Sequence, residues 1–116
     1  MRGGLLIALP PSEGKAAGGD GPPLDLAGLS HAEGLTRPRE RVLTELVKLC
    51  AGAEAGRRLT RARTVLGLSE GLAGEVAVDA ALPGAPTLPA AARYTGVLFD
   101  HLALPTLPAA ARARAA

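Results

Sequence analysis

The sequence predicts an α/β fold, because it combines one short apolar run with several stretches of helical spacing. Leu5–Leu9 is a continuous apolar run bounded by Gly4 and Pro10, which fits a central strand covered on both faces. Apolar residues recur at helical spacing within residues 36–50 and 54–66. The 116 residues amount to one domain or part of one, with few large side chains for a core.

The clearest helix follows a Gly- and Pro-rich loop over residues 10–34. Thr36 is a candidate cap, Pro38 is tolerated in a first turn, and Gly52 ends the helical pattern. On the outer face, Arg41 is expected to pair with Glu45, four residues further on.

A second, basic helix is predicted over residues 54–66 and leads into a tight turn. Gly67 suits a left-handed helix end, and Ser69 suits the cap of a following helix. That helix would turn Leu72, Val76 and Ala80 inward, so two helices would meet at a short hairpin.

A Pro-Thr-Leu-Pro-Ala phrase occurs twice, at residues 86–90 and 105–109. Each copy is followed by Ala-Ala-Arg and is predicted to begin a helix, with Thr as the cap and Pro in the first turn. Two copies are too few for a solenoid.

The charge and cysteine content exclude some classes of protein. The net charge of +2 is too small to indicate nucleic-acid binding by itself, but residues 37–63 hold eight basic residues against three acidic ones. The single cysteine, Cys50, excludes an internal disulfide and favours a reducing compartment. The initial apolar run is too short for a signal peptide, and no segment is long enough to span a bilayer, so no membrane association is expected.

Gly14 and Lys15 follow the predicted strand and suggest a phosphate-binding loop. The spacing argues against it, because Leu9 stands where the first glycine belongs and Ala16 follows the lysine. Ser12, Glu13 and Lys15 remain on a turn at a strand end, the usual edge for a binding crevice in open sheets. The alternative is an ordinary capped turn.

The predicted hairpin over residues 66–72 has the shape of a helix-hairpin-helix, which directs free amides at a DNA phosphate. The basic first helix favours this interpretation. Ser69 in place of a second glycine and the acidic second helix, beginning with Glu70, favour an ordinary helical turn instead.

Neither a metal site nor a catalytic set can be assigned from the sequence. His31 and His101 lie 70 positions apart and have no paired ligands, so we expect no metal and no other cofactor. Cys50 falls on the apolar stripe of the first helix and is predicted to be a buried hydrophobic residue. No small-molecule ligand can be identified.

Several phrases, taken in order, resemble the YaaA family of peroxide-stress proteins. They are Pro10-Pro11-Ser12-Glu13-Gly14-Lys15, Pro22-Pro23-Leu24-Asp25-Leu26, Arg37-Pro38-Arg39-Glu40-Arg41-Val42, Leu66-Gly67-Leu68-Ser69 and Tyr94-Thr95-Gly96-Val97-Leu98-Phe99-Asp100. The N-terminal Pro-Ser-Glu-Gly-Lys turn and the Tyr94-Thr95-Gly96 phrase are the most specific. Members of the family are longer, so residues 1–116 resemble the N-terminal portion of a single YaaA-type domain whose C-terminal half is absent.

The resemblance implies a cytoplasmic protein that limits oxidative damage to DNA and protein by lowering free iron. It also implies a YaaA-type fold and duplex DNA binding through a helix-hairpin-helix beside a basic cleft. The implied DNA contacts are Gly67, Ser69 and Gly71 in the hairpin and Lys15, Arg57, Arg58 and Arg61 in the cleft.

Three hypotheses follow. The first, which we favour, is a non-enzymatic DNA-binding stress protein. The second is a nucleic-acid base-processing enzyme, in which burial would make Lys15 a nucleophile and Ser12 or Glu13 would assist proton transfer. The third is an inactive truncated fragment that folds only with a partner segment.

Overall fold

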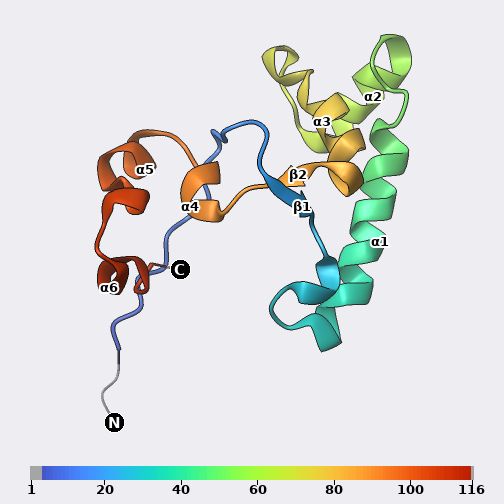
Figure 1. Cartoon of the computed structure of the whole chain (residues 1–116). Helices are drawn as coiled ribbons and strands as arrows, with labels where there is room; N and C mark the ends of the chain where they lie inside the picture. Colours follow the sequence, from blue (N-terminus) through green and yellow to red (C-terminus); the bar gives the residue numbers. More distant parts are fainter. Residues whose placement is uncertain (1–3, 116) are drawn as a thin grey trace. The chain divides into compact units, whose positions relative to one another are not determined.

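The computed structural model of the chain describes residues 4–115 and is mixed helix and strand (Figure 1). The chain divides into two compact units. We call residues 22–86 the helical unit, and residues 1–21 together with 87–116 the terminal unit. The mixed class predicted from the sequence is confirmed at this level, whereas a single YaaA-type domain stays a prediction.

Three α-helices and three 3₁₀ turns form the helical unit within the described residues. The helices are α1 (Ala32–Cys50), α2 (Gly56–Leu66) and α3 (Glu75–Ala81). The 3₁₀ turns are Leu26–Gly28, Glu70–Leu72 and Leu82–Gly84. Helix α1 packs against both α2 and α3.

Helix α1 begins earlier than the sequence predicted. It starts after His31, whose backbone is left-handed with φ 59°, so Pro38 lies inside the helix and not in its first turn. Thr36 does not cap, because its hydroxyl donates to the carbonyl of Ala32 (2.7 Å). Arg39 donates to the carbonyl of Ser30 (2.9 Å) and so secures the new helix start, an interaction that periodicity alone does not reveal.

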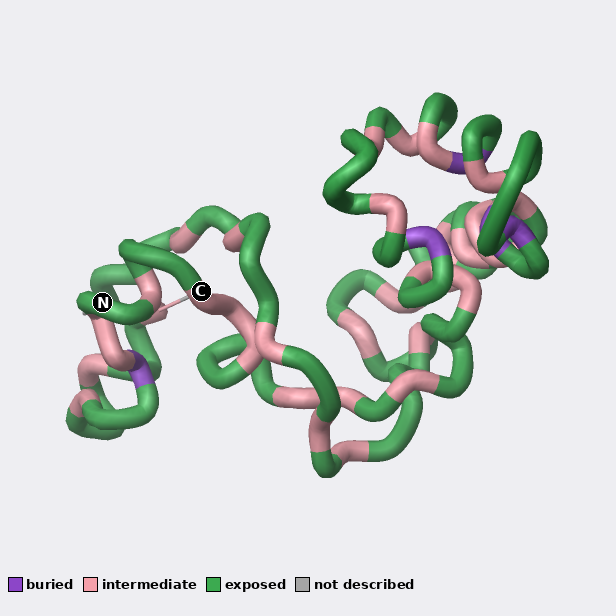
Figure 2. Tube along the Cα trace, turned by 90° about the horizontal axis from the view of Figure 1, so that it is seen from above, coloured by how far each residue is buried: buried purple, intermediate pink, exposed green. Residues whose placement is uncertain are grey.

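The core of the helical unit is small. Cys50, Ala53, Ala62 and Val76 are buried, with Leu46, Leu49, Leu59, Leu66, Leu68 and Ala80 packed around them. Figure 2 colours the buried residues purple. The predicted burial of Cys50 and Val76 is confirmed, but Leu72, expected to point inward, is 39% exposed. Because the buried residues are mostly small, the helices approach one another without much apolar area between them.

Short helices make up most of the regular structure of the terminal unit. These are α4 (Ala90–Arg93), α5 (Val97–Leu102) and α6 (Ala109–Arg112), with a 3₁₀ turn at Leu104–Thr106. Both repeated phrases precede a helix as predicted, but the capping residue is wrong. Pro89 and Pro108 occupy the cap positions, so each helix begins after the proline and Thr87 and Thr106 lie outside it.

The predicted buried strand over residues 5–9 is wrong for this chain. Leu5 and Leu6 are 68% and 67% exposed, and Ile7 forms only an isolated parallel bridge with Ala115. A strand with two apolar faces needs neighbouring strands and covering helices, and the described part of the terminal unit supplies neither. The run is therefore extended but uncovered.

The described residues contain one two-stranded sheet. Strand β1 (Gly21–Pro23) pairs antiparallel with β2 (Pro86–Thr87), where the chain passes between its two units. Gly21 is required there, because a Cβ atom would lie 2.2 Å from the hydroxyl oxygen of Thr87. Neither short strand was predicted from the sequence.

Candidate nucleic-acid interface

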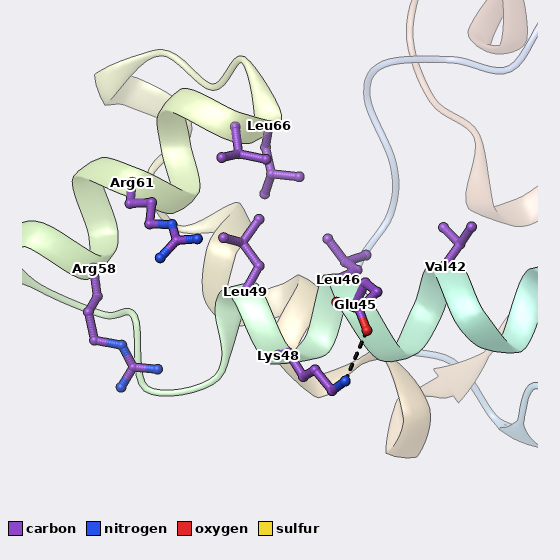
Figure 3. A pocket seen from close by; sticks show the side chains of 9 residues that line it. Val42, Glu45, Leu46, Lys48, Leu49, Arg58, Arg61 and Leu66 are labelled. Carbon is purple, nitrogen blue, oxygen red and sulfur yellow. Dashed lines mark hydrogen bonds and ion pairs between the residues drawn. The ribbon is translucent and has the colours of Figure 1, made fainter.

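A basic pocket lies between α1 and α2 in the helical unit (Figure 3). Its volume is about 570 Å³. The lining residues are Val42, Glu45, Leu46, Lys48 and Leu49 from α1, and Arg58, Arg61, Val65 and Leu66 from α2. The apolar members form the floor between the helices, and three cations stand around it. The pocket thus combines an apolar floor with a positive edge.

The charges of the pocket are not balanced within it. Lys48 forms an ion pair with Glu45 (2.9 Å), and both side chains are largely exposed. This pair replaces the predicted pair of Arg41 with Glu45. Since Glu45 is the one acidic residue among those that line the pocket, Arg58 and Arg61 have no carboxylate partner there. The net charge of the lining is therefore positive, as a site for an anion requires.

Arg58 and Arg61 differ in how firmly they are held. Arg58 donates to the carbonyl of Ala51 (2.7 Å), which fixes its guanidinium against the loop between α1 and α2. Gly52 in this loop has φ +66°, and a Cβ there would lie 3.0 Å from the Arg58 guanidinium. Arg61 has no hydrogen bond or ion pair to any described residue, so its donors are free for a ligand.

The structure brings together only part of the predicted basic cleft. Arg57 lines a separate shallow groove along α2, which it shares with Arg61. Lys15 belongs to the terminal unit. Lys48, which the sequence analysis did not select, joins Arg58 and Arg61 instead. The periodicity of the first helix could have suggested it, because Leu46, Leu49 and Lys48 share a turn.

A bend lies where the hairpin was predicted, and the amides of residues 69–71 have no backbone acceptor among the described residues. Gly67 ends α2 in the left-handed conformation (φ 67°), as predicted. Ser69, Glu70 and Gly71 are exposed, and the first amide bonded in the next turn is that of Leu72, which donates to the Ser69 carbonyl. Ser69 occupies the N-cap position of the following 3₁₀ turn, as predicted, but its side chain makes no capping hydrogen bond.

The helix that follows this bend differs from a typical helix-hairpin-helix. A 3₁₀ turn comes first, and α3 itself has only seven residues. The dipole of so short a helix is weak, and Glu70 and Glu75 add negative charge at its start. The hairpin amides therefore offer an anion less than the arginines do.

Two phrases quoted for the family resemblance meet in the terminal unit. Lys15 forms an antiparallel bridge with Tyr94, and the amide of Thr95 donates to the carbonyl of Gly14 (3.1 Å). A Cβ on Gly14 would lie 2.8 Å from the Thr95 hydroxyl, so this close approach explains the glycine. Gly96 has φ 107°, which favours glycine at that position too. The Pro-Ser-Glu-Gly-Lys turn and the Tyr94-Thr95-Gly96 phrase are therefore bonded directly to each other within the terminal unit.

Side chains in this turn are engaged with its backbone. Lys15 donates to the carbonyl of Ser12 (2.7 Å), and its ammonium lies 5.7 Å from the centre of the Tyr94 ring. Ser12 donates to the carbonyl of Gly14. Lys15 and Glu13 are exposed. Burial therefore does not activate Lys15 here, and no geometric observation favours the base-processing hypothesis.

Two titratable groups in the helical unit are shifted, and neither lines the basic pocket. Burial, and to a smaller extent the charge of Asp79, raises the pKa of the Cys50 thiol. Burial and then the charge of Glu75 raise the pKa of Asp79. Cys50 is thus a protonated core side chain at neutral pH, not a nucleophile.

Residues 4–115 contain neither a cluster of metal-binding side chains nor a membrane-spanning helix. No group of three or more His, Cys, Asp or Glu side chains in this range could hold a metal ion. None of the helices there is both long and apolar enough to cross a membrane.

Comparison with known proteins gives three informative relatives. The chain is 57% identical over 112 residues to a UPF0246 protein of Streptomyces coelicolor, covering 97% of this chain and 41% of that protein. It is 47% identical to a UPF0246 protein of Corynebacterium efficiens, covering 97% and 42%. For a UPF0246 protein of Corynebacterium glutamicum the identity is 44%, covering 84% and 36%.

The chain thus spans about two fifths of the length of the curated relatives it matches. No protein-family model matches the sequence. No solved structure matches it either. The names of the relatives state no activity.

Proposed function

Because the homologues of this chain are UPF0246 proteins, which form the YaaA family, we propose that it acts in the peroxide stress response. In this proposal a cytoplasmic protein limits oxidative damage to DNA and protein by lowering free iron, and it binds duplex DNA. The family resemblance supports the stress role. The basic pocket between α1 and α2 supports the DNA-binding role.

The observation that carries the DNA-binding proposal is the uncompensated charge of Arg58 and Arg61 beside Lys48. Guanidinium groups bind phosphate oxygens through two parallel donors, and Arg61 has all its donors free. Contacts of this kind go to the DNA backbone and carry no sequence information. We therefore propose binding that depends on charge and not on base sequence.

The hairpin has a secondary part in this proposal. Ser69 and Gly71 are exposed residues whose amides have no backbone acceptor among the described residues, which supports a role in binding phosphate. Glu70 lies between them and opposes an anion. We assign the main contact to the arginines of α2 and a supporting contact to the bend.

The DNA-binding proposal can be tested by titrating the 116-residue chain against a labelled duplex at several salt concentrations. Three phosphate contacts predict a slope of log affinity against log salt of about 2.7, at about 0.9 per phosphate. Replacing one contact, as in Arg61→Ala, is expected to lower the slope by about 0.9. Fluorescence anisotropy measures both values.

Arg41→Ala is the matched control, because it removes the same charge from the exposed part of α1 outside the pocket lining. It is expected to leave the slope unchanged. Equal slopes for the two variants, or no binding by the unmodified chain at low salt, would contradict DNA binding through this pocket.

The stress role needs a cellular measurement. In a bacterium from which the gene has been deleted, we expect lower survival after hydrogen peroxide and a higher level of chelatable iron, measured by electron paramagnetic resonance. Both should return to normal when the gene is restored. Unchanged iron and survival in the deleted strain would contradict this role whatever the DNA titration gives.

A further inference from the structure

The first apolar run of the terminal unit is exposed to solvent. Leu5 and Leu6 are 68% and 67% exposed, and Ile7 is 48% exposed. In an extended segment these three adjacent aliphatic side chains alternate between two faces, so both faces of the run expose apolar area to water. Isolated exposed leucines would need no explanation, but a continuous run does.

The backbone of this run makes few hydrogen bonds within the described part of the chain. Between described residues, residues 5–9 make one backbone hydrogen bond, from the amide of Ile7 to the carbonyl of Arg114 (2.6 Å). An extended segment with free amides and carbonyls is a template for another strand. Its apolar side chains on both faces additionally require covering layers.

An apolar pocket adjoins the end of the same run. Its volume is about 450 Å³, and Leu9, Pro11, Tyr94, Phe99 and Leu104 are among its lining residues. The Tyr94 and Phe99 rings are in contact, with centres 5.3 Å apart. Leu104 is the single buried hydrophobic residue in the described part of the terminal unit. The unit therefore has an open apolar pocket in place of a closed core.

The relatives indicate what would cover this surface. They match 97% of this chain, including the apolar run and the pocket, yet the match accounts for only 41–42% of their own length. The remainder of each relative lies outside the matched region. An uncovered apolar surface in a sequence so similar to longer proteins fits a surface that the additional polypeptide covers.

We propose that the docking face, defined as residues 5–9 with the apolar pocket beside them, is covered by another segment of polypeptide. Its occupant is the part of a full-length UPF0246 protein that this chain does not match. That polypeptide adds a strand along residues 5–9 and places apolar side chains over Leu5 and Leu6 and into the pocket. The proposal is independent of DNA binding, which involves the helical unit.

The test uses the complete 116-residue chain and the unmatched part of the Streptomyces coelicolor relative, mixed as two chains and also joined by a flexible linker. We expect a one-to-one complex by light scattering. Hydrogen exchange at the amides of residues 5–9 should slow by about tenfold or more in both forms, because strand pairing protects them. The joined form keeps the test valid if the separate second polypeptide folds poorly.

A double variant, Leu5→Asp with Leu6→Asp, should lose this protection at the remaining amides of the run. Val78→Asp is the control, because Val78 is 54% exposed, lies on α3 of the helical unit and lines neither pocket. Unprotected amides in the joined form, or equal loss in both variants, would overturn the proposal. Protection in the free chain alone, with the mass of a dimer, would overturn it in favour of a second copy.

Discussion

The helical unit buries Cys50, Ala53, Ala62 and Val76 around one point, whereas the described part of the terminal unit buries only Leu104. The difference does not come from a lack of apolar residues. Leu5, Leu6, Val97 and Leu98 all belong to the terminal unit and are all at least 47% exposed. Apolar content alone therefore does not produce a core.

The contrast follows from how far apart the partners lie in the sequence. In the helical unit, α1, α2 and α3 are consecutive, so each amphipathic face finds the next helix after a short loop. In the terminal unit, the pairs that hold the structure join residues about 80 positions apart, such as Gly14 with Thr95. Closing such a long loop costs more conformational entropy than closing the short loops between consecutive helices.

The largest expected effect is the loss of the core contact at Val76. Val76→Ala should lower the free energy of unfolding of the helical unit by about 2 kcal/mol, because it leaves a cavity where the side chain is 1% exposed. Urea unfolding followed by circular dichroism measures the change. Val78→Ala, on the same helix and 54% exposed, should change stability by less than about 0.5 kcal/mol. Similar losses for both would mean that Val76 does not belong to a packed core of the helical unit.

A smaller effect is expected in the terminal unit at Gly14. Gly14→Ala should weaken the pairing with Thr95 by about 1 kcal/mol, because its Cβ approaches the Thr95 hydroxyl. Hydrogen exchange at the Thr95 amide, which donates to the Gly14 carbonyl, should then be about fivefold faster. The double variant Gly14→Ala with Thr95→Ala should restore the original rate. Failure of this rescue would show that the clash is not the cause.

The smallest effect concerns Asp79 in the last turn of α3. Burial and Glu75 raise its pKa above 3.8, so the folded state holds the proton more tightly than the unfolded state. Stability therefore falls as the pH rises from 3.8 through the raised folded pKa. Asp79→Asn removes the titrating carboxyl group, and with it the loss of folding stability at higher pH. It also removes a negative charge that is unfavourable at the C-terminal end of a helix, so it should stabilise the chain at pH 7 by about 0.5 kcal/mol.

This gain should disappear below pH 3.8, where the carboxyl group is protonated in both states. Glu33→Gln serves as a control of opposite sign, because Glu33 lies in the first turn of α1, where a negative charge is favourable. Thermal unfolding across the pH range measures both variants. A gain for Asp79→Asn that did not vary with pH would exclude titration of Asp79 as its origin.

Helices were easier to predict than their ends. The apolar spacing located α1 and α2, and Gly67 correctly marked the end of α2, because a left-handed residue there favours glycine. Thr36 was wrongly assigned as a cap, and Ser69 takes the cap position without a side-chain hydrogen bond. A threonine hydroxyl can bond to any of several nearby backbone groups. The hydroxyl of Thr36 donates to the Ala32 carbonyl inside the helix and so does not cap the helix start.

The candidate site could be predicted only in part. The basic stretch of residues 37–63 was visible in the sequence, but the pocket selects Lys48, Arg58 and Arg61 from it and leaves Arg57 in a different groove. Which cations converge depends on how α1 and α2 face each other. That rotation is set by the packing of Leu46, Leu49 and Leu66, and no local pattern encodes it.

By itself, the sequence determined the amphipathic helices, the left-handed glycine after α2 and the resemblance to the YaaA family. These depend on residues near one another in the chain or on the order of short phrases. Only the tertiary structure decided that Gly14 meets Thr95, that Arg58 and Arg61 share a pocket with Lys48, and that Leu5, Leu6 and Ile7 stay exposed. The reason is physical: local spacing fixes which face of a segment is apolar, but burial depends on whether another surface comes to cover it.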